Sequence, residues 1–445
     1  MNKTALIIEP YGNDHIVIED LNTSGYSLIS VTFEDVSRIY PPFKHSKLKE
    51  NITFSVTNKM INSVPFLVQY MIPKYSKIIE NNRISLIVPT HKTNDINFLI
   101  VGHLNQVFKF PGLNKKQARF WYRKSRYLKH FKSLGFKTPN ILQIVPMKEY
   151  PDTLPIQSFP VICKPDCGSG GEGVYVAKSP KELDVLFQPA DKNEPMSEFA
   201  KLFRQRDQFG RRRNYLFTLI RSNYLIEEFI PGSVISVAGI KAINGIEVSL
   251  IYEIKPSNLP FRSENEFLAP FDKIESLERV RSIVPQMIKQ SVFPLGPFML
   301  DFILDSKGDL YLIDAAPRLS ATAIQFFGPC YADNSYVTRS ISALLEKRIN
   351  IQKRDKPLVY VYSKRLPLPK GQLIRFSQKE SFSEYVIDWQ FYLKPGEKIF
   401  QERNDSFTER KGHITVIGKD IQEAKKRWSQ EYKKLEILID TFPNS

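Results

Sequence analysis

The chain has 445 residues, 42% of them hydrophobic, and its 63 Lys and Arg against 47 Asp and Glu give a net charge of +16. This length predicts two to four compact units with ample core. No apolar run approaches the length of a membrane span, and three cysteines are too few for a disulfide framework, so we expect a cytoplasmic protein without a membrane partner. The charge alone is compatible with nucleic-acid binding, but no DNA- or RNA-binding motif accompanies it, so nucleic acid is a disfavoured partner.

The first unit is predicted to be a parallel sheet with helices packed on it, over roughly residues 1–112. Three apolar runs are expected to be its strands: Thr4–Glu9, Tyr26–Phe33 and Ile84–Pro89. Helical stretches separate them, and strands that alternate with helices are typical of parallel sheets. The ends of these strands carry little recognisable chemistry.

A helix and a glycine-rich loop come next. Lys115–Gly135 has apolar and basic residues at helical spacing and is followed by Pro139, which predicts one helix. Phe159–Val176 indicates a buried strand that ends near Lys164, a glycine-rich turn and a second strand. Backbone N–H groups of such a turn can bind phosphate oxygens, because glycine has no Cβ to block a close approach. A neighbouring lysine adds a positive charge for the same phosphates.

The glycine loop alone is compatible with several kinds of site. Gly168–Gly173 matches G-x-G-x-x-G, but a dinucleotide site needs a helix after the loop, and Val174–Ala177 is expected to be a strand. The pattern G-x-x-x-x-G-K-[ST] of a P-loop is absent. A kinase glycine loop fits the strand–loop–strand order, yet the chain has no H-R-D-L-x-x-x-N and no D-F-G. An ordinary glycine hairpin stays an alternative.

The second half of the chain is predicted to be mostly strands. The basic segment 201–213 is interpreted either as a solvated helix and turn or as an arm that binds phosphate or an acidic substrate. Expected strands follow at Tyr224–Ile230, Val234–Ile240 and Glu247–Ile254, with a helix at about Ile274–Gln290. The last unit, from about residue 356, is expected to be strand-rich and to end in a helix over Ile421–Leu435.

Two aspartates are expected to face each other in a hairpin. Gly296–Leu304 and Asp309–Asp314 are apolar runs separated by a short turn, so Asp301 and Asp314 are expected on adjacent antiparallel strands. Carboxylates in apolar surroundings must be compensated, and Mg²⁺ held jointly with substrate phosphates is one solution. Arg318 follows closely. The alternative is a pair of strand-end aspartates that cap nearby turns.

Together, the lysine, the glycine loop, the acidic hairpin and the turn Asp314-Ala-Ala-Pro-Arg318 resemble the ATP-grasp superfamily over about residues 1–435. The resemblance implies an α/β fold, α+β in its ATP-grasp part, with three domains. These are a Rossmann-like pre-ATP-grasp domain at 1–112, a two-lobed ATP-grasp domain at 113–350 with a lid subdomain at about 145–228, and a small strand-rich α+β domain at 351–445. Leu393–Lys398 and Arg410–Gly418 are similar to the C-terminal domain of carboxylate–amine ligases, such as L-amino acid ligases and enzymes like biotin carboxylase. A plain interaction domain is the alternative for this last unit.

The resemblance also implies roles for individual residues. It implies ATP with Mg²⁺ or Mn²⁺, Asp301 and Asp314 as metal ligands, and Arg318 as the catalytic arginine that steadies an acyl phosphate. Lys164 matches a phosphate-binding and catalytic lysine. Lys124 matches another phosphate lysine, although Arg123 stands where the family usually has Asp. The remaining implied nucleotide-binding residues form the lid loop and the hinge: Gly168, Ser169, Gly170, Gly171 and Gly173, and Glu227, Glu228, Phe229 and Ile230.

Two positions depart from the family pattern. Ala316 stands where a third metal ligand, Asn, is frequent, and Ser233-Val234-Ile235 stands where a ribose-binding Glu is frequent. The function implied is an ATP-dependent ligase that activates a carboxylate as an acyl phosphate and joins it to an amine, with release of ADP and phosphate. An amino acid or short peptide is the expected substrate, and a homo-oligomer stays open. The alternatives are a nucleotide-binding regulatory or interaction subunit without turnover, and a basic nucleic-acid binder.

Overall fold

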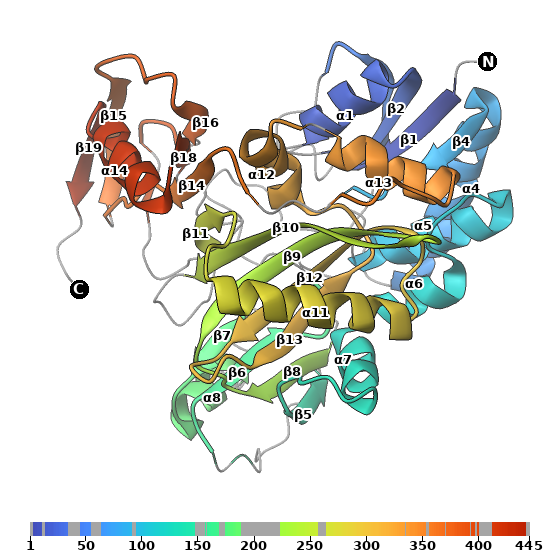
Figure 1. Ribbon diagram of the computed structural model, residues 1–445, viewed down its shortest axis with the longest axis horizontal. Coiled ribbons are helices and arrows are strands. Elements are labelled where there is room, and N and C mark those ends of the chain that lie inside the picture. The colour runs from blue at the N-terminus through green and yellow to red at the C-terminus, as the bar shows by residue number, and fades with distance from the viewer. Residues whose placement is uncertain are drawn as a thin grey trace, which may run out of the picture.

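The computed structural model describes residues 3–10, 14–33, 45–54, 64–90, 95–146, 156, 158–168, 174–187, 223–256, 264–333, 335–352, 356–369, 371–391, 393–396, 398–399 and 412–441. Their strands form four sheets, which Figure 1 shows together with the helices that cover them. No helix within these ranges is long and apolar enough to cross a membrane. Ser169, Gly170, Gly171, Gly173 and the basic segment 201–213 lie outside the described residues.

The N-terminal sheet is parallel, as the alternation of strands and helices predicted. Its strand order is β3-β2-β1-β4, and each neighbouring pair is parallel. The apolar run of β1 is buried on both faces, which is typical of a parallel sheet covered by helices. One strand, β3, was not predicted. The elements are β1 (Lys3–Ile8), α1 (Asp14–Thr23), β2 (Tyr26–Phe33), β3 (Leu48–Phe54), α4 (Val64–Asn82), β4 (Ile84–Ile87) and α5 (Asp95–Phe108).

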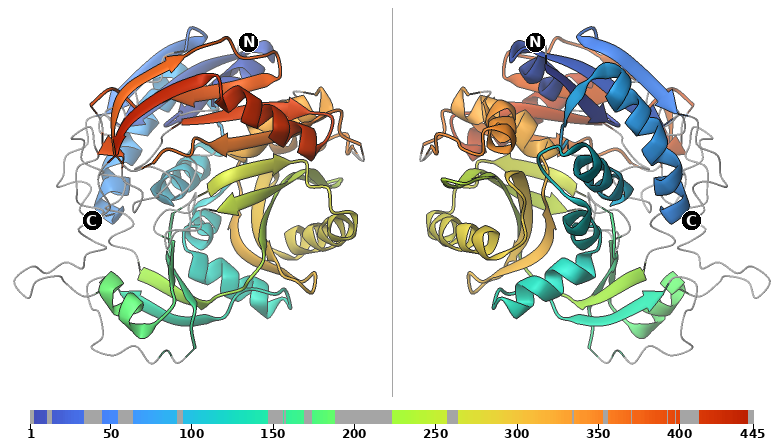
Figure 2. Two further views of the ribbon diagram at one scale, coloured as in Figure 1. Left: turned by 90° about the vertical axis from the view of Figure 1, so that its left-hand side faces the viewer. Right: turned by 90° about the vertical axis from the view of Figure 1, so that its right-hand side faces the viewer.

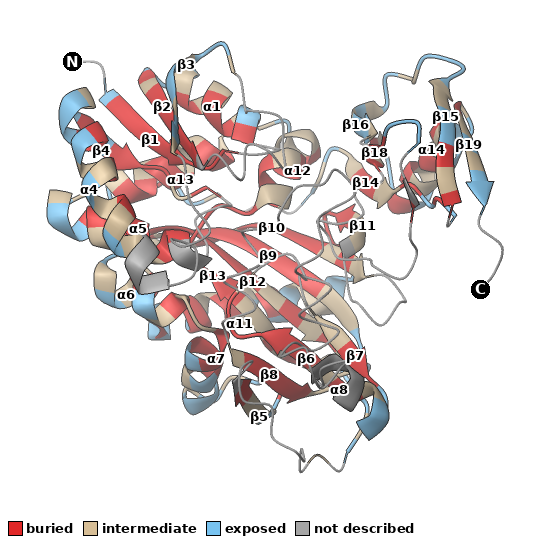
Figure 3. Cartoon of the chain, turned by 180° about the vertical axis from the view of Figure 1, so that it is seen from behind, coloured by how far each residue is buried: buried red, intermediate tan, exposed pale blue. Residues whose placement is uncertain are grey.

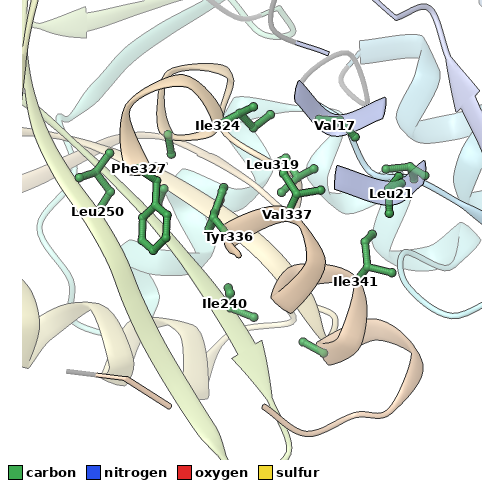
Figure 4. Packing of buried hydrophobic residues seen from close by; sticks show 14 of the residues in the cluster. Val17, Leu21, Ile240, Leu250, Leu319, Ile324, Phe327, Tyr336, Val337 and Ile341 are labelled. Carbon is green, nitrogen blue, oxygen red and sulfur yellow. The ribbon is translucent and has the colours of Figure 1, made fainter. Parts of the chain in front are cut away.

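The central sheet is antiparallel and runs in the order β13-β12-β9-β10-β11-β14-β18-β16. The helix α11 lies along one face of it (Figure 1), while α12 and α13 pack between the sheet and the N-terminal unit. Figure 4 shows this second contact, in which Phe327 and Tyr336 meet Ile240 of β9 and Leu250 of β10. The elements are β9 (Ser233–Ala242), β10 (Gly245–Pro256), β11 (Glu264–Ala269), α11 (Ile274–Gln290), β12 (Gly296–Leu304), β13 (Leu310–Ala316), α12 (Ala321–Tyr331) and α13 (Tyr336–Leu345).

A separate four-stranded sheet forms a second lobe, below the central sheet in both views of Figure 2. Its order is β5-β8-β6-β7, and β6 and β7 are antiparallel on either side of the glycine loop. The expected strand after the loop is therefore confirmed, and this arrangement differs from a dinucleotide fingerprint. The elements are β5 (Ile141–Pro146), β6 (Val161–Pro165), β7 (Tyr175–Ala177), α8 (Pro180–Phe187) and β8 (Asn223–Glu228).

The predicted single helix over 115–135 is wrong, because the chain forms α6 (Lys115–Trp121) and α7 (Lys124–Ser133). Arg123 is extended between them, with φ −124° and ψ 123°. The buried carboxylate of Asp166 accepts hydrogen bonds from the backbone N of Ser125 at 2.7 Å and from its Oγ at 3.0 Å. This satisfies a free N–H at the start of α7, so the new helix begins at Lys124.

The C-terminal strands are shared between two sheets. β14, β18 and β16 continue the central sheet beyond β11, and β17, β15 and β19 form a small sheet of their own. The domain boundary that was predicted at residue 350 therefore precedes three strands, β14, β16 and β18, that belong to the central sheet. This boundary stays a proposal. Figure 3 shows that burial continues from the central strands into β14 and β18. The elements are β14 (Tyr360–Arg365), β15 (Gly371–Gln378), β16 (Val386–Phe391), β17 (Lys398–Ile399), β18 (Gly412–Gly418), α14 (Ile421–Tyr432) and β19 (Leu435–Thr441).

The final helix is shorter than predicted. It ends at Tyr432, and Leu435, which was assigned to the helix, begins strand β19. The apolar residues Leu435, Ile437 and Ile439 alternate, and this period of two suits pairing with β15. The expectation that the chain ends in a helix is therefore wrong.

Candidate functional site

A large pocket opens between the second lobe and the central sheet. It encloses about 1070 Å³ of empty space, part of which is its open mouth. Strand β6, the end of β8, the hairpin β12–β13 and the start of α7 contribute to its wall. Nine residues that the sequence singled out line it: Lys124, Lys164, Gly168, Glu227, Glu228, Phe229, Ile230, Asp301 and Asp314. Apolar side chains, among them Ile162, Val174, Ile254, Ile303 and Ile313, make up much of the remaining wall.

Lys164 and Glu227 form a buried ion pair in this wall. Lys164 Nζ lies 2.7 Å from one carboxylate oxygen of Glu227, and the side chains are 6% and 2% exposed. Lys164 Nζ also donates to the backbone oxygen of Ile313 at 3.1 Å. Burial raises the pKa of Glu227 above its ordinary value, and Lys164 only partly offsets this. No donor among the described residues reaches the second oxygen of Glu227, so this oxygen can accept a hydrogen bond from a bound ligand.

Lys124 and Tyr127 converge on Asp314. Lys124 Nζ donates to Asp314 Oδ2 at 2.8 Å and to the backbone oxygen of Gly168 at 2.8 Å, while the Tyr127 hydroxyl donates to Asp314 Oδ1. Burial raises the pKa of Asp314, but Lys124 and Tyr127 outweigh it and hold the pKa below its usual range. Asp314 is therefore an ionised carboxylate, and it is already paired with the ammonium group of Lys124 beside the glycine loop.

Asp301 and Asp314 face each other across the hairpin, as predicted. They are directly paired in the register of β12 and β13. Two carboxylates are a donor set that suits a hard cation such as Mg²⁺, with phosphate oxygens and waters as the other ligands. Within the described part of the chain, no group of three His, Cys, Asp or Glu residues gathers around a metal position. Ala316 supplies no third ligand, so the residues fit Mg²⁺ only if a bound phosphate helps to hold it.

Arg318 lies in a smaller recess that we call the side pocket. It is lined by Phe98, Trp121, Tyr122, Tyr127, Ala315, Ala316 and Arg318, and by Lys124, Cys167, Gly168 and Asp314, which it shares with the large pocket. Arg318 is 7% exposed and its Nη1 donates to the backbone oxygen of Leu319 at 2.9 Å. The next backbone N–H, of Leu319, donates to Pro89 O after β4, at 2.9 Å. The N-terminal unit therefore helps to position Arg318.

Asp166, Tyr127 and Phe98 are among the residues of this region that the sequence did not mark as functional. Asp166 holds Lys124 beside the end of β6, because its backbone oxygen accepts from the Lys124 N–H at 2.7 Å. Its position two residues after Lys164 was the available signal. Tyr127 and Phe98 sit in helical patterns that are equally typical of core residues, so nothing in the sequence marked them.

The chain matches solved structures along nearly its whole length. An L-amino acid ligase from Bacillus licheniformis is similar with a TM-score of 0.76 at 15% identity, covering 99% of both chains. The biotin carboxylase domain of a Hydrogenobacter thermophilus 2-oxoglutarate carboxylase, solved with MgADP and bicarbonate, matches with a TM-score of 0.64 at 15% identity, over 98% of this chain and 90% of that one. An N5-carboxyaminoimidazole synthetase from Staphylococcus aureus, complexed with ADP, matches with a TM-score of 0.60 at 16% identity, over 97% of each chain.

These similarities confirm the ATP-grasp fold that the sequence resemblance implied. No protein-family model and no curated protein sequence matches the chain. At such low identity the shared property is the fold, and the chemistry must be inferred from the residues of the site.

Proposed function

We propose that this chain is an ATP- and Mg²⁺-dependent ligase that joins a carboxylate to an amine. The observation that carries the proposal is the convergence of Lys124, Lys164, Asp301 and Asp314 on one pocket, with Arg318 in an adjoining recess. This set provides cations for phosphates, carboxylates for a metal and a guanidinium for an acid. The neighbouring solved ligases, two of which were solved with ADP, support the same chemistry.

The large pocket accommodates ATP in this proposal. The adenine lies against the apolar wall near the hinge, where backbone groups of Phe229 and Ile230 and the unpartnered oxygen of Glu227 can bind its polar edge. The carboxylate of Glu228 is engaged elsewhere, since it accepts from Asn140 N at 2.8 Å. Lys164 and Lys124 then lie where phosphate oxygens can compete for their charge. Gly168, at the start of the glycine loop, is proposed to lie beside the phosphates, while Ser169, Gly170, Gly171 and Gly173 lie outside the described residues.

Asp301 and Asp314 are proposed to hold Mg²⁺ together with the phosphates. When bound, the metal neutralises charge on phosphate oxygens as the phosphoryl group is transferred. Because Lys124 pairs with Asp314 in this structure, we propose that Lys124 moves to the phosphates as nucleotide binds. The binding of Mg²⁺ and the movement of Lys124 both act through electrostatic attraction, and neither requires a nucleophilic side chain.

The proposed reaction has two transfers. A carboxylate oxygen of the first substrate attacks the γ-phosphorus of ATP, and ADP leaves, which gives an acyl phosphate. The nitrogen of the second substrate then attacks the acyl carbon, phosphate leaves and the amine loses a proton. Arg318 binds the carboxylate and later the acyl phosphate. The name of the Bacillus licheniformis neighbour favours an amino acid or short peptide as substrate, and a cytoplasmic location is part of the proposal.

A second reading is a nucleotide-binding subunit that does not turn over. Ala316 favours it, because the position supplies no metal ligand. The retained pair of aspartates and the buried Arg318 favour the ligase.

The proposal is tested by ADP release across a panel of carboxylates paired with amines, with mass spectrometry of the products. The ligase predicts ADP and a condensed product, smaller by one water than the two substrates together, for at least one pair. Lys164→Ala is expected to lower the rate strongly. ATP binding without ADP release for any pair would favour the regulatory subunit, and full turnover by Lys164→Ala would overturn the site assignment.

A further inference from the structure

The side pocket joins the proposed ATP pocket at its phosphate end, where Lys124, Gly168 and Asp314 line both spaces. The empty space in the side pocket is about 300 Å³, a figure that includes some open solvent. The recess is much smaller than the large pocket. The space therefore suits a compact molecule that lies directly beside the phosphates.

The wall of the side pocket is aromatic and firmly held. Phe98 comes from α5, which packs closely on α6 because Gly102 has no side chain: a Cβ there would lie 2.4 Å from Ala118 Cβ. Phe98 precedes Gly102 by one helical turn and so faces the same side. The Trp121 ring contacts Tyr127 with a centroid distance of 5.6 Å. These contacts give the recess a fixed apolar surface.

The same recess contains the buried guanidinium of Arg318, whose charge no carboxylate in the described part of the chain neutralises. Within the described residues, no carboxylate forms an ion pair with Arg318, and its Nε has no hydrogen-bond partner. Trp121 Nε1 is a second buried donor for which the described part of the chain offers no hydrogen-bond partner. A buried guanidinium is costly unless an anion compensates it. Two buried donors beside aromatic rings therefore indicate a ligand with one anionic end and an apolar body.

A second negative charge on the ligand finds no such partner. The other cation that lines the recess, Lys124, already pairs with Asp314 at 2.8 Å. Among the described residues of the wall, Arg318 is the cation left for a ligand carboxylate. The recess thus favours monocarboxylates over dicarboxylates.

We propose that the side pocket selects the carboxylate substrate of the proposed ligase, and that this substrate is a monocarboxylate of about amino-acid size with an apolar or aromatic group. Arg318 binds its carboxylate beside the γ-phosphate, and Phe98, Trp121 and Tyr122 contact the apolar group. The inference rests on the proposed function for the reaction, but the binding preference can be measured without turnover.

Hydroxylamine in place of the amine provides the first test, because its nitrogen displaces phosphate from an acyl phosphate and leaves a hydroxamate. With the full chain, Mg²⁺ and ATP, we expect kcat/KM for L-phenylalanine or 3-phenylpropionate to exceed that for L-glutamate or succinate by at least about tenfold. Phe98→Ala enlarges the recess and is expected to shift preference from phenylalanine toward naphthylalanine by about fivefold or more. Phe108→Ala, on the same helix but outside both pockets, is the matched control and is expected to leave the ratio unchanged.

A preference of the wild type for dicarboxylates would overturn the side-pocket proposal. The same phenylalanine-to-naphthylalanine ratio of kcat/KM in wild type, Phe98→Ala and Phe108→Ala would do so as well. Neither result would contradict the ligase proposal. If no acid yields hydroxamate, the ligase proposal fails. The side-pocket proposal is then tested by the binding of a monocarboxylate alone. Trp121 lies in the recess, so 3-phenylpropionate should change tryptophan emission saturably in the presence of MgADP, and Arg318→Met should abolish the change. No saturable change in the wild type would overturn the side-pocket proposal as well.

Discussion

Each of the two lysines of the pocket is paired with a different carboxylate: Lys164 with Glu227 and Lys124 with Asp314. The pairs differ in burial, because Glu227 is almost fully enclosed whereas Asp314 is partly accessible. A buried pair contributes little net stability over an apolar substitute, but loss of one partner leaves an uncompensated charge. Lys164 and Glu227 are thus expected to be energetically coupled.

A double-mutant cycle measures this coupling. Lys164→Met and Glu227→Gln are each expected to lower the free energy of unfolding by about 3 kcal/mol. The double variant is expected to cost less than the sum by about 1–3 kcal/mol, measured by urea unfolding. The exposed pair Lys137 and Asp309 is the control, with an expected coupling below about 1 kcal/mol. Additive losses at Lys164 and Glu227 would contradict the pair seen here.

At the scale of elements, the break between α6 and α7 positions the site. It places Lys124 in the first turn of a helix, where the helix dipole adds to the lysine's attraction for anions. The break depends on Asp166, which holds Ser125 and also pairs with Arg123 at 3.2 Å. The carboxylate of Asp166 therefore links the start of α7 to the end of β6, the strand that carries Lys164.

Asp166→Ala is expected to remove the cap of α7 and to weaken ATP binding, because Lys124 loses its fixed position. The stability loss should be about 1–2 kcal/mol, and isothermal titration should show a higher Kd for ATP. Asp420→Ala is the matched control, since Asp420 caps α14 through the Glu423 N–H at 2.8 Å far along the chain. Asp420→Ala should lower the free energy of unfolding by a similar amount and leave the Kd for ATP unchanged. Equal effects of both variants on ATP binding would contradict this role of Asp166.

The sequence predicted the hairpin at Asp301 and Asp314 because two apolar runs flank a short glycine turn, a strictly local signal. It predicted one helix where there are two, because the cap comes from Asp166, distant in sequence. It also extended the last helix into β19, since the pairing with β15 that stabilises that strand is non-local. Phe98 was unpredictable as a site residue, because it reaches the pocket only through the packing of α5 on α6.

At the scale of the whole molecule, the central sheet connects the C-terminal strands to the proposed ATP pocket. Because β14, β16 and β18 share this sheet with β9 and β12, we predict that they unfold together with the pocket. Gly412→Ala tests this, because a Cβ there would lie 2.3 Å from the backbone oxygen of Gln390 in β16, at a φ of +129°. It should lower stability by more than about 1 kcal/mol.

Calorimetry should show one main transition, which moves down in Gly412→Ala and up when MgADP is added to either protein. A separate transition that responds to Gly412→Ala but not to MgADP would show that the C-terminal strands unfold independently.

We propose that the pocket transfers a phosphoryl group from ATP to a carboxylate. The most direct measurement is the initial rate of ADP formation with acid and amine supplied singly and together, in wild type, Asp314→Asn and Asp309→Asn. We predict that ADP formation requires the acid and that Asp314→Asn is slower by about 100-fold or more. Asp309→Asn, in the exposed turn of the same hairpin, should match the wild type. Substrate-dependent ADP formation that persists undiminished in Asp314→Asn would contradict the account.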